Sequence, residues 1–250
     1  MTKLLALLCA LVGLGGVALA ADLPVPAPQP VYVPPPVPLH NWTGSYVGIN
    51  GGWGWGTAKW TVGPIPGTPL AAGLSNSISD NGGVVGGTLG FNWQIAGFGG
   101  FVFGAEGDWD YSAINTGTTS TICNFSSSCQ TGNNWLATVR GRAGYAWDRI
   151  LFYATAGGAF ANVQTVFNGA TTTSHNQAGW TVGAGVEWAF AENWSAKLEY
   201  LYVDLGNASV TCTVTPQCTT NRFPTTGIPV TVGLTENLIR AGVNFKFYYP

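Results

Sequence analysis

Charged residues are scarce in this 250-residue chain, where nine Lys and Arg and eleven Asp and Glu make up 8% of the sequence. A soluble domain usually carries about 25%, which keeps its surface hydrated. The formal net charge of −2 gives no basic surface, so we expect no nucleic-acid partner. Disordered chains are poor in aromatic residues, whereas this chain has 13% of them and 36 glycines. The composition favours an all-β protein that is solvated in part by lipid.

Long apolar runs are missing after residue 20, where no stretch approaches the ~18 residues that a membrane helix needs. The one such run, Leu4–Ala20, follows Lys3 and ends in Ala-Leu-Ala. This pattern is typical of a secretory signal peptide that is cleaved near Ala20. An uncleaved membrane anchor is the alternative. Without membrane helices, a mature membrane protein would have to be a β-barrel.

Proline is concentrated ahead of the main body of the chain, with eight of the 15 prolines between Pro24 and Pro38. Such a segment favours an extended polyproline II spacer without a core of its own. A plain flexible leader is at least as well supported as a role as a specific ligand. We therefore predict a signal peptide over 1–20, a Pro-rich periplasmic spacer over 21–41 and a β-barrel over 42–250.

Apolar and polar residues alternate with a period of two in eight segments of about ten residues, which is the pattern of half-buried strands. For the segment 151–163, rich in Gly and Ala, the alternation does not show which face is outward. The predicted strands are Ser45–Trp55, Val84–Gln94, Phe101–Tyr111, Trp135–Trp147, Leu151–Val163, Ala178–Phe190, Trp194–Tyr202 and Leu238–Phe247.

The connections between these segments alternate in length. Short ones lie near 96–100, 148–150 and 191–193, and long ones near 56–81, 112–133, 164–176 and 206–235. The pattern predicts an eight-stranded antiparallel up-and-down transmembrane β-barrel with short periplasmic turns and long extracellular loops. Tryptophans near the strand ends fit the aromatic girdles of such barrels. A soluble barrel with an apolar interior is the alternative, but it needs a charged exterior that this sequence lacks.

Ten charged side chains fall on the strand face opposite the apolar one. Because charges facing lipid are costly, we expect them in the lumen as a neutral network of ion pairs. A gated narrow pore is the alternative, since an eight-stranded barrel is just wide enough for side chains to fill. The predicted network comprises Glu106, Asp108, Asp110, Glu187 and Glu199 with Arg140, Arg142, Lys197, Arg240 and Lys246.

Counting residues from the periplasmic ends of neighbouring strands predicts which charges face each other. We expect cross-strand pairs of opposite sign, which contribute about 0.2–1 kcal/mol each. The predicted pairs are Glu106 with Arg142, Asp108 with Arg140, and Glu187 with Lys197.

Four cysteines remain after the leader, as two C-x5-C pairs in predicted loops. In an oxidising compartment this spacing favours disulfides, Cys123 with Cys129 and Cys212 with Cys218, although two other connectivities are possible. Metal binding is disfavoured because no His or acidic residue is close in sequence to either pair. We therefore expect no metal, no cofactor and no catalytic residues.

Histidine is almost absent, and His175 is the one in a predicted surface loop. It is a candidate haem ligand, but an ordinary solvated loop residue is the favoured interpretation. A hydrolytic site would need a carboxylate or serine partner at the barrel rim, and His175 has no carboxylate near it in sequence. The sequence therefore gives little support for an enzyme.

Several segments resemble the small OmpA-like outer-membrane barrels of alphaproteobacteria, the opacity-type porin family of surface antigens. They are Asn41–Gly48, Trp180–Glu187, Ser195–Tyr200 and Asn237–Phe247, together with Ala-Asp-Leu-Pro after the leader. The resemblance implies an abundant surface barrel; members are called porins or adhesins, and a few bind haem. Family chains usually end on an aromatic residue that is recognised during barrel assembly, which implies that role for Phe247. Because three residues follow Phe247, either it is recognised internally or the signal is altered.

Barrel pattern and resemblance together predict an outer-membrane protein that maintains the envelope and presents loops to the exterior. A low-conductance porin for small solutes is the alternative, and a haem-binding or adhesin barrel is less favoured. The expected partners are outer-membrane lipid and lipopolysaccharide, the barrel-assembly machinery, and peptidoglycan or a host surface.

Overall fold

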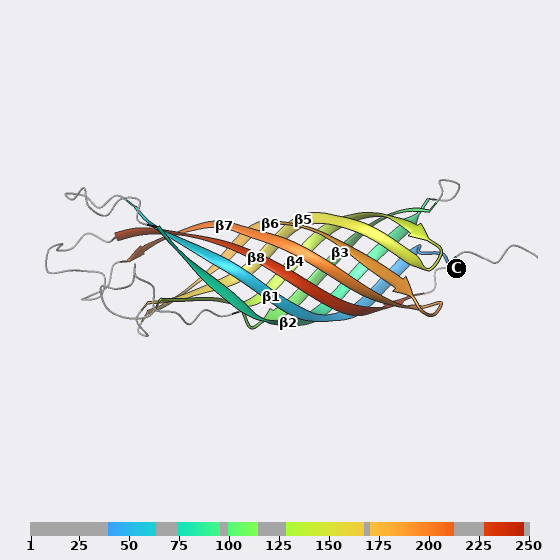
Figure 1. Ribbon diagram of the computed structural model, residues 1–250, viewed down its shortest axis with the longest axis horizontal. Coiled ribbons are helices and arrows are strands. Elements are labelled where there is room, and N and C mark those ends of the chain that lie inside the picture. Colours follow the sequence, from blue (N-terminus) through green and yellow to red (C-terminus); the bar gives the residue numbers. More distant parts are fainter. Residues whose placement is uncertain are drawn as a thin grey trace, which may run out of the picture. The chain divides into compact units, whose positions relative to one another are not determined.

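The computed structural model describes residues 40–63, 75–95, 100–114, 129–167, 171–212 and 228–247. In these ranges the chain forms eight antiparallel strands, each paired with the next in sequence, and β8 pairs with β1 to close a barrel (Figure 1). No helix in the described ranges is long and apolar enough to cross a bilayer. The strands are β1 Gly44–Val62, β2 Ser75–Gln94, β3 Phe101–Ser112, β4 Cys129–Trp147, β5 Ile150–Phe167, β6 Thr171–Ala189, β7 Trp194–Cys212 and β8 Ile228–Lys246.

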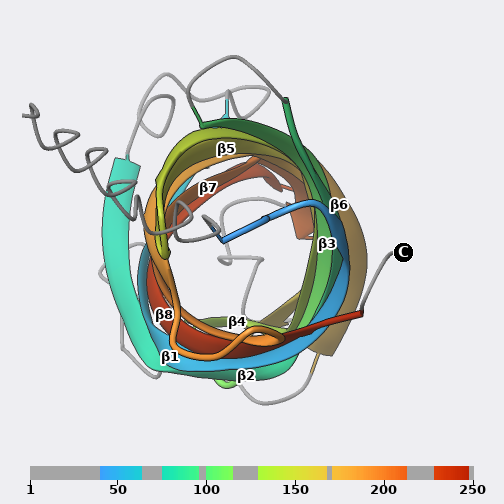
Figure 2. The ribbon, with the colours of Figure 1, turned by 90° about the vertical axis from the view of Figure 1, so that its right-hand side faces the viewer.

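The predicted eight-stranded barrel is confirmed, but most strands continue further toward the long connections than predicted. β5 and β6 are separated by three residues, 168–170, so the long loop predicted over 164–176 is wrong. Much of the loops predicted over 56–81 and 206–235 is also strand. Seen along the barrel, the strands form a closed ring around the lumen (Figure 2).

The missed strand segments have the opposite polarity to the rest of the barrel. In the first half of β1, the apolar Ile49 and Trp53 face outward. Nearer the end of the strand the polar Thr57 and Lys59 face outward, and the apolar Ala58 and Trp60 are buried inside. In β8 the outward residues change in the same way, from Ile239 to polar residues such as Thr235. The apolar face thus changes sides along each strand, which hides the continuation from a search for one apolar face.

Two bulges interrupt the ladder near the level of this inversion, between Asn133 and Leu136 in β4 and between Asp204 and Asn207 in β7. Gly206 has a φ of 70° in the second, a left-handed conformation that glycine adopts without steric cost. The facing of β5 is also settled, because Leu151, Tyr153 and Thr155 point into the lumen.

Candidate functional site: the lumen and its surroundings

Apolar side chains cover the outside of the middle of the barrel. Val139 is 65% exposed and Leu198 is 54% exposed, values that a water-soluble surface would not show for a continuous band. Aromatic rings border the band at both ends. Those at the short-turn end include Trp93, Trp147, Trp188 and Trp194, and those at the other end include Trp55, Tyr111, Trp180 and Tyr202. The exterior therefore has the apolar band and the two aromatic girdles of a membrane barrel.

Inside this band lies a buried network of ion pairs. Nine of the ten predicted lumen charges are buried; Lys246 is half-buried at the short-turn end. The side chains that form the ion pairs are each 2% exposed or less. Because removing one partner would leave a charge without water or counter-ion, the network requires all of its members.

Four residues at the centre of the network form a closed ring. Arg140 donates to Asp108 at 2.6 Å and to Glu199 at 3.0 Å. Arg240 donates to the same two carboxylates, at 2.8 Å to Asp108 Oδ1 and at 2.7 Å to Glu199 Oε2. Arg240 also pairs with Asp110. The ring connects β3, β4, β7 and β8 and so ties non-adjacent parts of the barrel wall together.

A second group extends the network toward the short-turn end. Glu106 accepts from Arg140 at 2.6 Å and from Lys197 at 3.0 Å, and lies 3.6 Å from Arg142. Arg142 donates to Glu187 at 2.8 Å, and Glu187 accepts further bonds from Ser195 at 2.5 Å and Asn244 at 2.8 Å. Each of these carboxylates has at least two cationic or polar partners, as buried charges require.

Two tyrosines hold the Arg142 guanidinium between their rings. Its Cζ lies 3.9 Å from the ring centroid of Tyr153 and 5.7 Å from that of Tyr46. The Tyr46 hydroxyl donates to Glu106 at 2.7 Å and accepts from Arg142 at 2.8 Å. Each ring lies over a glycine paired directly opposite it, Gly90 for Tyr46 and Gly185 for Tyr153. These glycines leave the space that the rings occupy.

Replacing Gly90 by Ala is expected to destabilise the barrel by about 1–3 kcal/mol, the usual cost of overpacking. An added Cβ would lie 2.3 Å from Cζ of Tyr46, so the ring and its bonds to Glu106 and Arg142 must shift. Gly87→Ala is the matched control on β2, because its Cβ would meet Gly48 O at an ordinary 3.7 Å. Urea unfolding in lipid vesicles measures both variants, and equal losses would contradict the proposed packing role of Gly90.

Apolar layers close the lumen on both sides of the ion pairs. Toward the long connections the interior is filled by a cluster that includes Trp60, Ile114, Leu136, Leu201 and Leu238. Toward the short turns a smaller cluster contains Trp42, Val102, Ala146, Leu151, Tyr153 and Ala189. The ion pairs therefore lie between two apolar clusters.

Residues 40–43, which we call the strap, cross the mouth of the barrel at the short-turn end (Figure 2). Trp42 is 3% exposed, and its indole N–H donates to the backbone oxygen of Asp148 at 3.1 Å. Asp148 lies in the β4–β5 turn, half-way around the barrel from β1. The backbone N–H of Trp42 donates to Gln94 at 2.9 Å, and Lys246 Nζ donates to Asn41 O. The strap thus joins the start of β1 to β2, to β8 and to the opposite turn.

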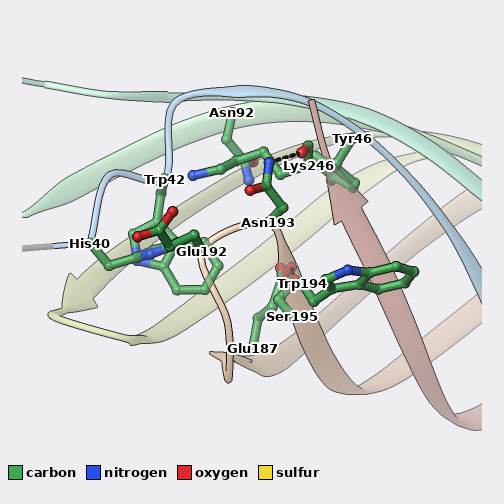
Figure 3. A pocket seen from close by; sticks show the side chains of 10 residues that line it. All are labelled: His40, Trp42, Tyr46, Asn92, Glu187, Glu192, Asn193, Trp194, Ser195 and Lys246. Carbon is green, nitrogen blue, oxygen red and sulfur yellow. Dashed lines mark hydrogen bonds between the residues drawn. The ribbon is translucent and has the colours of Figure 1, made fainter. Parts of the chain in front are cut away.

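A small pocket lies between the strap and the ends of β6, β7 and β8. In Figure 3, His40 and Trp42 lie together at one side, and Asn193 and Lys246 lie on the other. The His40 and Trp42 rings are 5.0 Å apart, edge to face. The cavity measures about 10 Å³, room for about one water molecule. It is too small to hold an organic solute.

The strap is expected to loosen in mild acid. Burial, with help from the cations Lys246 and Arg149, lowers the pKa of His40 from 6.5 to about 4, while the carboxylates Asp148 and Glu187 act in the opposite direction. The folded strap therefore holds His40 neutral, whereas a released strap binds a proton below pH 6.5. The stability that depends on His40 is complete above about pH 6.5 and decreases as the pH falls toward 4.

The pH dependence can be isolated by comparing the chain with its His40→Gln variant. The thermal midpoint of the unchanged chain should fall more between pH 7.5 and pH 5 than that of the variant, because glutamine takes up no proton. The remaining pocket carboxylates, Glu187 and Glu192, are common to both proteins. An identical pH dependence would show that His40 does not control the strap.

The structure corrects part of the predicted register. Glu187 lies opposite Lys197, as predicted, but Lys197 forms its ion pair with Glu106 and Glu187 forms its ion pair with Arg142. The predicted pairing of β3 with β4 is wrong by two residues, because in the structure Glu106 lies opposite Arg140 and Asp108 lies opposite Thr138. The predicted partners still meet, but diagonally: Asp108 and Arg140 at 2.6 Å and Glu106 and Arg142 at 3.6 Å.

Sequence analysis missed several members of the lumen. Glu236 is buried and accepts from Asn133 at 2.9 Å, and Asn133 in turn accepts from Ser112 at 2.6 Å. Glu236 falls between the loop predicted over 206–235 and the strand predicted from Leu238, although its alternation with Leu234 and Leu238 places it on the inner face. The inward tyrosines could have been found in the same way, since Tyr46 alternates with the apolar outer face of β1.

Some predicted site residues lie outside the described part of the structure. Cys123 and Cys218 fall in segments that are not described, and the side chains of Cys129, Cys212 and His175 are likewise outside it. The two disulfides therefore stay predictions. Phe247 is described, lies outward with its ring 5.5 Å from that of Phe245, and donates its N–H to Ser45 O at 2.9 Å. Its role as an assembly signal also stays a prediction.

Comparison with known proteins also indicates an outer-membrane β-barrel. The family "Outer membrane protein beta-barrel domain" matches residues 8–247. The chain is 35% identical over 202 residues to the 31 kDa outer-membrane immunogenic protein of Brucella melitensis, covering 77% of this chain and 83% of that protein. It is 30% identical over 170 residues to the 22 kDa outer membrane protein of Rhizobium leguminosarum bv. viciae, covering 68% and 67%.

Among solved structures, the outer membrane protein OprG from Pseudomonas aeruginosa has the same fold. The similarity covers 83% of this chain and 99% of that chain, with a TM-score of 0.54 and 11% sequence identity. Closed barrel, apolar band and aromatic girdles together define an integral β-barrel of the bacterial outer membrane. The chain belongs to the outer membrane protein β-barrel family, and it is related to the outer-membrane immunogenic proteins of Brucella.

Proposed function

We propose that this outer-membrane barrel is a structural and surface protein whose lumen is permanently filled and does not conduct solutes. One observation carries the proposal: the lumen ion pairs are each 2% exposed or less and lie between two apolar layers. A water-filled path would require many of these contacts to break at once. The rigid barrel then serves to hold the external loops at the cell surface.

The arrangement of the ion pairs also supports a mechanical role. Arg140 and Arg240 share Asp108 and Glu199, so each cation contacts carboxylates from two or more strands. Glu106 bonds to Tyr46 of β1, and Lys197 contacts Thr88 of β2. Tyr153 of β5 donates to Glu199, and Glu187 of β6 binds Arg142. The network therefore includes side chains from all eight strands. These cross-connections resist flattening of the barrel's cross-section by lateral pressure from the membrane.

Planar-bilayer recording of the refolded chain tests this proposal. We expect no stable, ohmic channels at neutral pH. Reproducible low-conductance channels would instead support the porin alternative. In that case the double variant Arg140→Met with Arg240→Met, which opens the central ring, should change the conductance, whereas a contaminating porin would be unaffected.

The proposal includes no catalytic role. It names as partners the lipid and lipopolysaccharide around the barrel, the barrel-assembly machinery, and peptidoglycan or a host surface reached by the parts outside the band. The relationship to immunogenic surface proteins supports exposure of the loops to the exterior.

A further inference from the structure

Beyond the aromatic girdle that lies nearer the long connections, which we call the upper girdle, four neighbouring strands present a regular polar face. β2, β1, β8 and β7 lie side by side here, and their outward residues form rows across the wall. The lowest row belongs to the girdle and contains Trp55 and Tyr202. The three rows above it are Ser79–Thr57–Thr235–Asp204, Ser77–Lys59–Gly233–Asn207 and Ser75–Thr61–Thr231–Ser209. We call these three rows the hydroxyl face.

The chemistry of the hydroxyl face is uniform. Eight of its twelve positions are Ser or Thr, and its two charges, Lys59 and Asp204, are of opposite sign. All of its positions are exposed or half-exposed. Behind it the interior is packed with apolar side chains, among them Ala58, Trp60 and Leu234, which keep the strands in a fixed geometry. The hydroxyl groups of the face are therefore carried by the paired strands of the barrel wall.

Resting on the proposed exposure of this end of the barrel to the cell exterior, we propose that the hydroxyl face binds the neutral sugars of the glycolipid that surrounds the barrel in the outer leaflet. Its position fits, because it begins one row above Trp55 and Tyr202, where the hydrocarbon region ends. Three rows two residues apart span about 13 Å along the tilted strands, the depth of about two sugar rings rather than of a single phosphate layer.

Charge and hydrogen-bonding capacity select the same partner. A phosphate site would need a cluster of Arg or Lys, whereas this face has one Lys balanced by one Asp. Each Ser or Thr hydroxyl both donates and accepts hydrogen bonds, as sugar hydroxyls do. A second copy of this chain is a poorer fit, because the centre of a protein interface is apolar and aromatic.

The test compares glycolipids with and without sugars. The full chain, refolded in lipid nanodiscs, is offered a lipopolysaccharide with a neutral core oligosaccharide, or the same lipid after mild acid has removed the sugars. Native mass spectrometry measures the amount of each that is retained. We expect at least fivefold preference for the form with sugars, and the triple variant Thr57→Ala, Ser79→Ala, Thr235→Ala should reduce that preference to twofold or less.

A matched control separates the face from the rest of the rim. Asn162→Ala with Gln164→Ala removes outward polar groups from β5, on another part of the wall, and should leave the preference unchanged. Heat-dependent gel mobility verifies that all variants are folded. Equal retention of both lipids by the unchanged chain would mean that the face is merely hydrated, and would overturn the proposal.

Two further outcomes would also overturn it. If free core oligosaccharide binds as tightly as the glycolipid, the partner is a soluble sugar rather than the surrounding leaflet. If the triple variant instead abolishes a dimer, the face is a contact between copies. None of these outcomes bears on the filled lumen, because that proposal is tested separately by conductance.

Discussion

Replacing Arg140 by Ala should destabilise the folded barrel by about 3–5 kcal/mol, the cost of leaving buried charges without their partner. Three carboxylates, Glu106, Asp108 and Glu199, lie within 3.0 Å of its guanidinium nitrogens. With folded proteins stable by about 5–15 kcal/mol, a loss of this size removes a large part of the total. Urea unfolding in lipid vesicles measures it directly.

Arg149→Ala is the matched control for this substitution. Arg149 is exposed in the β4–β5 turn, and its contact with Ala189 O is long, at 3.4 Å. Its loss should change the free energy of unfolding by no more than about 0.5 kcal/mol, as for other surface positions. Similar losses for the two arginines would mean that the lumen is hydrated and that its ion pairs do not stabilise the fold.

Double-mutant cycles can then decide between the observed and the predicted register of β3 and β4. If Glu106 faced Arg142, as the counted register has it, losing both side chains would cost less than losing Arg142 alone. In the structure Glu106 keeps Arg140 and Lys197 when Arg142 is lost, so the double variant Arg142→Ala with Glu106→Ala should be less stable than Arg142→Ala. The coupling between Glu106 and Arg140, 2.6 Å apart, should also exceed that between Glu106 and Arg142, 3.6 Å apart. The opposite order would favour the register counted from the strand ends.

The success and failure of the register prediction have one physical cause. β6 and β7 are joined by a tight turn, so counting from that turn places Glu187 opposite Lys197, as observed. β3 and β4 are joined by a long connection, and their ends are not level. Strands in a barrel tilt and are staggered relative to one another, which moves the pairing by a residue or more per strand. Sequence alone does not contain this stagger.

The charged residues of the lumen could be predicted because a charged side chain that faces lipid is energetically costly. Their partners could not, since an arginine side chain reaches several strands: Arg240 of β8 binds Asp108 of β3, which is not a neighbouring strand. The aromatic residues that point into the lumen were harder to predict than the charges. Tyr153 lies in a Gly- and Ala-rich segment whose facing is ambiguous in sequence and is decided by packing over Gly185 and Arg142.

The upper barrel shows how the solvent determines the strand pattern. Within the band the exterior meets lipid and the lumen is polar, whereas above it the exterior meets water or sugar and the interior is apolar. Glu236 lies close to this change, between Leu234 and Leu238, and a prediction that expects one polarity throughout leaves it outside the strand. The inversion also marks where the hydrocarbon ends, at the level of Trp55 and Tyr202.

This boundary leads to the second large effect that we expect. Leu198→Arg should destabilise the barrel by about 2–4 kcal/mol, the cost of an arginine facing lipid near the middle of the bilayer. Leu198 is 54% exposed and lies on β7 midway between the girdle residues Trp194 and Tyr202. Ser209→Arg, on the same strand but beyond the girdle, should cost no more than about 0.5 kcal/mol, because its side chain meets an aqueous environment. Unfolding in vesicles of one lipid composition measures both variants. Equal costs at the two positions would place the membrane boundary elsewhere and refute the assignment of the upper barrel to the exterior.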